Sequence, residues 1–211
     1  LIAALCVLFI TAVSAHEPLP LRIEHRAAIR DLPAPAATTQ SLELRVVNLD
    51  QWPEAEIYAA LRSTAQILGQ CGIRVTRADL LQVTAPETHR HFDTPRSREL
   101  ARELALPKPA VFFTAGTRQI PAFDAEAIGR GNSRTRPELA DTVWIAKGAR
   151  DLGIVVAHEL AHVLMDSGEH DSSSGNLMSE STTPQNTQLT AAQCERLNAT
   201  GRRNGLLRGV D

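Results

Sequence analysis

The chain has 211 residues and a formal net charge of −2 at pH 7. Such a near-neutral charge does not create the strongly basic face that nucleic acid binding needs, so we expect no nucleic acid partner. Without a leader, just under two hundred residues remain, which suits one domain with a real core or two small lobes about a cleft.

The first fifteen residues form an apolar run that is interrupted only by Thr11 and Ser14. The run ends in small residues, which is typical of a secretory signal peptide over 1–15 that is cleaved after Ala15. It is shorter than the about 20 apolar residues of a spanning helix, so we expect no stable membrane span after leader removal. An uncleaved anchor is the alternative. Because no methionine or basic segment precedes the run, we expect the given sequence to begin inside the leader, and the mature chain to be secreted or periplasmic.

Cleavage after Ala15 removes Cys6 and leaves two cysteines, Cys71 and Cys194. Two thiols in an oxidising compartment are expected to pair, and the alternative is two buried free thiols. A disulfide between them would close a loop of about 120 residues and contribute on the order of 4–5 kcal/mol in the chain-entropy model.

Residues 16–40 are rich in proline and alanine and have little periodicity, which predicts an extended N-terminal arm. Residues 41–211 are expected to form a single domain, with an upper lobe to about residue 168 and a smaller C-terminal lobe over 169–211. We expect the protein to be a monomer.

Apolar residues alternate in 41–49 and predict the first strand, and Pro53 opens a helix with apolar residues at helical spacing as far as Gly69. His89 and His91 lie in a polar stretch and are expected to be exposed. No helix is evident in 116–141. The other predicted elements are a strand from 73–76, a surface helix at 94–106, strands at 111–114 and 142–146, and a final helix at 189–197 that starts at Thr190.

The sequence HELAH at 158–162 lies in an apolar segment with helical spacing, for which Asp151 is the expected N-cap and Gly168 the expected left-handed stop. Two histidines four residues apart lie on one face of a helix, so both imidazoles can reach one zinc ion at about 2.0–2.1 Å. Glu159 is rotated off that line, where its carboxylate can take a proton from a water on the metal.

Beyond this motif come Gly168, His170 and the tripeptide NLM at 176–178. With these residues the chain resembles the metzincin clan of zinc endopeptidases, particularly its secreted, matrixin-like bacterial members. The resemblance implies that His158, His162 and His170 bind one Zn²⁺, that Glu159 is the general base, and that Met178 forms the turn beneath the metal. The implied fold is α/β (α+β), of metzincin type: a mixed twisted sheet, two long helices and a small irregular C-terminal lobe.

The chain departs from the clan signature in two places. His170 stands two residues later than the signature places its third histidine, and Glu180 stands where the clan often has a tyrosine. Asp166 continues the face of the first two histidines, but three side chains one turn apart span roughly 11 Å, too far for one ion. Chain that turns back toward the metal offers instead Glu169, His170 and Asp171; zinc's preference for imidazole favours His170, with Asp171 next.

The resemblance implies a secreted zinc-dependent endopeptidase that acts on a polypeptide substrate. It also implies an edge strand along the substrate cleft near Gly129 and Gly131, where open backbone groups can pair with an extended peptide. The alternative is a secreted zinc-binding or pseudo-peptidase domain that binds a protein partner at its cleft without turnover. The intact Glu159 favours catalysis, because a purely structural zinc site has no need of a carboxylate beside the metal.

Overall fold

The computed structural model describes residues 19–118, 127–130 and 136–210. The leader at 1–15 and Gly131 lie outside these described residues. Among the described helices, none combines the length and the apolar character needed to cross a membrane.

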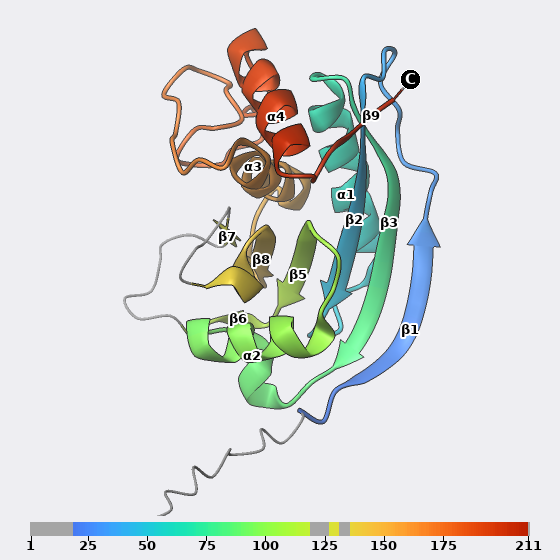
Figure 1. Cartoon of the computed structure of the whole chain (residues 1–211). Helices are drawn as coiled ribbons and strands as arrows, with labels where there is room; N and C mark the ends of the chain where they lie inside the picture. Colours follow the sequence, from blue (N-terminus) through green and yellow to red (C-terminus); the bar gives the residue numbers. More distant parts are fainter. Residues whose placement is uncertain (1–18, 119–126, 131–135, 211) are drawn as a thin grey trace, which may run out of the picture.

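A mixed sheet forms the centre of the molecule, with strand order β1-β3-β2-β5-β8-β7 (Figure 1). The strands β3, β2, β5 and β8 are parallel to one another, whereas β1 and β7 pair antiparallel at the two edges. The bounds are β1 Arg22–Ile29, β2 Gln40–Asn48, β3 Ile73–Thr84, β5 Ala110–Thr114, β7 Ala127–Arg130 and β8 Thr142–Ala146.

The central strands have buried side chains on both faces, as expected for parallel strands covered on both sides. Every residue of β5 is buried. Val111 and Phe113 join one apolar cluster, and Phe112 joins the other, where it stacks on Trp144 with ring centroids 4.0 Å apart. The sheet therefore separates two cores.

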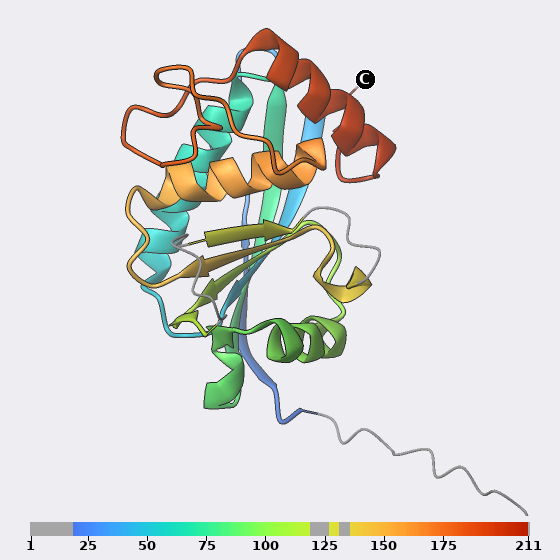
Figure 2. The same ribbon diagram turned by 90° about the vertical axis from the view of Figure 1, so that its left-hand side faces the viewer.

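Helices α1 (Glu54–Gly69) and α3 (Leu152–Met165) cover one face of the sheet and pack against each other, whereas α2 (Thr94–Leu104) covers the other face (Figure 2). Trp52 lies just before α1. The Asn48 side chain donates to its carbonyl and accepts from its backbone N–H, and its indole N–H donates to the Thr114 carbonyl at 3.1 Å. Short elements complete this half of the chain: the 3₁₀ turns η1 (Glu87–His89) and η2 (Pro137–Leu139), and the paired strands β4 (His91–Phe92) and β6 (Gly116–Thr117).

After α3, the chain folds as turns around a bridge between Asn176 and Gln188, and then forms α4 (Ala191–Arg203) and β9 (Arg208–Gly209). Helix α4 packs against α3. The expected disulfide joins Cys71, just after α1, to Cys194 in the first turn of α4. The Thr190 hydroxyl accepts a hydrogen bond from the backbone N–H of Gln193, and the Gln193 side chain accepts one from the backbone N–H of Thr190. The predicted start of this helix is therefore confirmed, with a complete capping box.

The segment 16–40, which was expected to be an extended arm, contributes a strand to the main sheet. Within it, β1 pairs along β3 from Arg22 opposite Thr84 to Ile29 opposite Ala78. Because β3 runs to Thr84, well beyond the predicted start at 73–76, its long outer edge provides the backbone partners that an isolated arm would lack.

Two local predictions are wrong. The left-handed residue after α3 is Asp166, with φ 48° and ψ 49°, and Gly168 does not have a positive φ; aspartate tolerates this conformation better than most residues do. His89 is buried, not exposed: η1 turns its ring toward α2, where Nε2 lies 3.0 Å from the Glu99 carboxylate. Asp151 precedes α3 as predicted, but it is itself left-handed and makes no side-chain cap.

Candidate metal centre

Helix α3 is apolar around most of its circumference and is almost completely buried between α1, α4 and the β7–β8 edge of the sheet. A helix with this composition is stable only in the interior of a protein. It carries two buried histidines, His158 and His162, which are 4% and 9% exposed. Polar rings in such a position need partners, and the structure supplies them.

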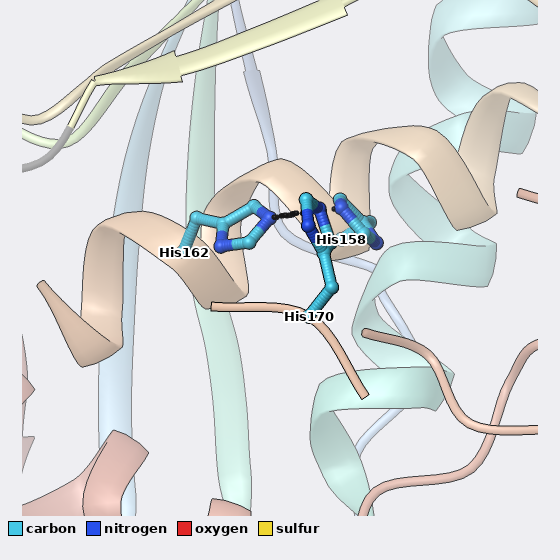
Figure 3. A group of neighbouring side chains, drawn as sticks. All are labelled: His158, His162 and His170. Carbon is cyan, nitrogen blue, oxygen red and sulfur yellow. Dashed lines mark hydrogen bonds between the residues drawn. The ribbon is translucent and has the colours of Figure 1, made fainter. Parts of the chain in front are cut away.

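The chain that follows α3 brings a third histidine to the first two. His158, His162 and His170 each offer one ring nitrogen, and these three nitrogens lie within 4.8 Å of one another. His170 reaches the helix from the turn region and is exposed (Figure 3). Nε2 of His162 is 2.9 Å from Nε2 of His158 and 3.3 Å from Nε2 of His170.

Backbone carbonyls determine which nitrogen carries the proton in two of these rings. Nδ1 of His158 is 2.7 Å from the Leu177 carbonyl, and Nδ1 of His162 is 2.7 Å from the Ser167 carbonyl. A carbonyl only accepts, so each Nδ1 is the donor and each neutral ring has a lone pair on Nε2. Lone pairs of two neutral rings that face each other at 2.9 Å repel unless a cation or a proton lies between them.

Two of the three nitrogen–nitrogen separations suit a zinc ion. At a Zn–N distance of 2.0–2.1 Å, the nitrogens of a tetrahedral site lie about 3.3 Å apart, close to the separations of 2.9 Å and 3.3 Å. Among the described residues, three imidazoles converge; three protein ligands with a fourth position for water or substrate are typical of catalytic zinc sites, whereas structural sites have four protein ligands. The donor set therefore fits zinc with room for a water or a substrate.

Burial favours the neutral form of the two rings on α3, His158 and His162. Desolvation, with smaller contributions from the neighbouring His158 and His170, lowers the pKa of His162 to about 4, against the opposing effect of the Ser167 carbonyl. Desolvation also lowers the pKa of His158. Neutral imidazole is the form that binds a metal ion, so the buried pair is ready to bind at pH 7.

In chain order, Glu159 lies between the first two histidines of this cluster and Met178 follows the third. Glu159 follows His158 on α3 and is partly exposed, unlike its buried helical neighbours. Met178 is 1% exposed and belongs to a tight turn in which its amide donates to the Asn176 side chain at 2.8 Å. Leu177 in the same turn provides the carbonyl for His158, so this turn orients the ring.

The carboxylates that compete with His170 have other partners. Asp171 Oδ1 accepts from the Ser173 amide at 2.8 Å, and its Oδ2 accepts from Gln193. Glu169 pairs with Arg196 at 2.6 Å. Among the described residues, the three histidines are the group whose nitrogens converge.

Sequence reasoning missed the groups that orient the histidines. The carbonyls of Ser167 and Leu177 leave no trace in residue type, because every residue has a carbonyl. Gln193 could have been found, since T-x-x-Q at 190–193 is a capping-box pattern. Of the two glycines expected along the substrate cleft, Gly129 lies in edge strand β7 opposite Val143 of β8.

Comparisons with known proteins support the fold. No family model and no curated protein matches the sequence. Among solved structures, the chain is similar to archaemetzincin from Methanopyrus kandleri, with a TM-score of 0.51 and 14% identity over 77% of this chain and 97% of that chain. This likeness supports the metzincin type of fold expected from the motif, and does not favour the matrixin-like subgroup within it.

Proposed function

We propose that this protein is a zinc-dependent endopeptidase in which His158, His162 and His170 bind one Zn²⁺ and Glu159 is the general base. The proposal rests mainly on the convergence of one nitrogen from each of three histidine rings. Two of these rings lie on α3, the helix that also bears Glu159, and their Nδ1 atoms donate to backbone carbonyls. The fold shared with archaemetzincin supports it at the level of architecture.

Each residue has a defined task in this proposal. His158, His162 and His170 would hold the zinc ion, which would supply a Lewis acid for a water and for the scissile carbonyl. Glu159 takes the proton of the attacking water and delivers it to the leaving amine. His158 and His162 stay neutral through burial, and the Leu177 and Ser167 carbonyls keep Nε2 directed inward. Within the described residues, β7 is the last strand of the sheet, and we propose that its outer edge pairs with an extended polypeptide.

The proposed location is the periplasm or the exterior of the cell, with the chain acting as a monomer. The Cys71–Cys194 disulfide supports this location, because disulfides persist mainly in oxidising compartments. Within the clan we retain the secreted, matrixin-like type as the proposal from the motif. Glu180 in place of a tyrosine leaves the developing oxyanion to zinc and backbone groups.

The test is digestion of an unfolded protein by the chain from residue 16 onward, with zinc removed by a chelator and then restored. We expect chelator-reversible cleavage, and we expect Glu159→Gln to bind zinc, keep the fold and lose cleavage by a factor of 10² or more. Equal cleavage by parent and variant would exclude Glu159 as the base. A parent that binds zinc and cleaves nothing would favour the non-catalytic, partner-binding alternative.

The third ligand is tested separately by His170→Ala and Asp171→Ala. We expect His170→Ala to lose tightly bound zinc, because the ring supplies one of three ligands, and we expect Asp171→Ala to retain a measurable zinc site. The opposite result would assign the ligand to Asp171.

A further inference from the structure

Helix α4 contacts both residues that flank His170. Arg196 Nη1 is 2.6 Å from Glu169 Oε2, and Gln193 Nε2 donates to Asp171 Oδ2 at 3.3 Å. His170 itself is exposed and lies outside any helix or strand. Because the Glu169–Arg196 pair is exposed and such pairs contribute little, Gln193 is the stronger candidate for holding this part of the chain.

The same glutamine also binds the turn that orients His158. Gln193 Nε2 donates to Asn176 Oδ1 at 3.1 Å, and Asn176 Nδ2 donates to Gln193 Oε1 at 3.1 Å. Asn176 Oδ1 in turn accepts from the Met178 amide at 2.8 Å. Next to Asn176, Leu177 provides the carbonyl to which His158 is bonded. One side chain thus joins the chain that carries His170 to the turn that orients His158.

The orientation of the side-chain amides of Gln193 and Asn176 is determined by partners that can only donate or only accept a hydrogen bond. Thr190 N–H donates to Gln193 Oε1 at 2.8 Å, and the Asp171 carboxylate only accepts, so Nε2 of Gln193 must face Asp171. Met178 N–H likewise fixes Oδ1 of Asn176. Rotation of either amide would break its bond to a backbone donor, and for Asn176 that bond is buried, so its loss is costly.

We propose that Gln193 is a positioning residue of the metal centre: by binding Asp171 and Asn176 with one side-chain amide, it sets the placement of His170 relative to His158. Within the described residues, the three imidazoles form hydrogen bonds with backbone carbonyls and with one another, not with Gln193, so Gln193 acts on metal binding through the backbone next to two of them. Cys194, the next residue, is tied to Cys71 after α1, which anchors the first turn of α4. The inference rests on the proposed zinc site and does not require peptide hydrolysis.

Gln193→Glu separates this positioning role from the capping role of the same residue. A glutamate keeps the acceptor for Thr190 N–H and for Asn176 Nδ2, and glutamate is a standard residue at this position of a capping box. It replaces the donor Nε2 by a carboxylate oxygen, which then faces the acceptors Asp171 Oδ2 and Asn176 Oδ1. The helix start and the bond from Asn176 Nδ2 are retained, whereas both contacts made by Nε2 become repulsive.

The measurement is the zinc affinity of metal-free protein, titrated with Zn²⁺ against a chelating indicator. Because loss of groups that orient metal ligands costs 10–100-fold in affinity, we expect Gln193→Glu to bind zinc about tenfold more weakly than the parent. Adding Asp171→Asn to Gln193→Glu places an amide donor opposite the new carboxylate, so we expect part of that affinity to return. Gln193→Met, which has similar length and no amide, should show the same weakening.

Thr190→Ala is the matched control. It removes the hydroxyl that accepts from Gln193 N–H at 3.2 Å and leaves the contacts of the Gln193 amide in place. We expect a lower unfolding temperature for this variant with unchanged zinc affinity. The inference is overturned if Gln193→Glu and Gln193→Met bind zinc as the parent does, or if Thr190→Ala weakens zinc as much as they do. Because the readout is metal binding, a parent that binds zinc but hydrolyses nothing would refute the proposed function alone.

Discussion

The contact between α1 and α3 allows a quantitative prediction for Gly153→Ala. A Cβ at this position would lie 2.4 Å from Ser63 Cβ, 2.7 Å from Ser63 Oγ and 3.0 Å from the Ala60 carbonyl oxygen. Carbon atoms pack best at about 3.5–4.0 Å, so α3 would have to move from α1 by about 1 Å. The Thr64 hydroxyl, which donates to the Gly153 carbonyl at 3.1 Å, would be displaced as well.

Two effects of opposite sign compete in this variant. Replacing glycine by alanine in a helix gains up to about 1 kcal/mol, whereas overpacking costs about 1–3 kcal/mol. We expect the upper end of that cost, because two of the obstructing atoms, Ser63 Cβ and the Ala60 oxygen, belong to or directly join the backbone of α1. The net loss is then about 2 kcal/mol in the free energy of unfolding, or a melting temperature lower by about 4–8 °C for a domain of this size.

Urea unfolding of parent and variant, both metal-free, measures this difference. Ser63→Gly combined with Gly153→Ala removes the obstructing Cβ and should recover most of the loss, less about 1 kcal/mol for a glycine within α1. Ser63→Ala combined with Gly153→Ala retains that Cβ and should recover little. If Gly153→Ala alone is more stable than the parent, helix propensity dominates and the close-packing argument is refuted.

Two further predictions concern the disulfide and the buried histidines. Cys71→Ser/Cys194→Ser releases a loop with a sequence separation of 123, so the chain-entropy model gives a loss of about 5 kcal/mol in urea unfolding, and a loss below about 1 kcal/mol would contradict that model. The pKa of His158 and of His162 is lowered in the fold, the latter to about 4, so below pH 6.5 the unfolded chain binds more protons than the folded one. The metal-free protein should therefore lose stability as the pH falls from 6.5 toward 4. His162→Gln should make stability depend less steeply on pH. An equally steep dependence in that variant would contradict the lowered pKa of His162.

The sequence by itself determined the parts of the molecule that follow a regular period. Helix α3 was predicted from its apolar spacing and the HELAH motif, and an interval of four residues suffices to place His158 and His162 on one face. The alternation in β2 and the start of α4 at Thr190 are equally local properties. The pairing of Cys71 with Cys194 followed from counting thiols on the expectation that the chain is exported, and the structure contains that bond.

The tertiary structure decided the features that do not follow from a periodic sequence pattern. The chain after Asp166 has no periodic pattern that fixes side-chain direction, so the sequence left His170 and Asp171 as competing ligands. The folded chain brings the His170 ring to the other two histidines, and it directs the Asp171 carboxylate to hydrogen bonds with Ser173 and Gln193. The pairing of β1 with β3 and the burial of His89 also depend on surfaces that are distant in sequence. The physical reason is that backbone carbonyls and amides orient this site, and every residue carries them, so residue type alone does not show where they meet.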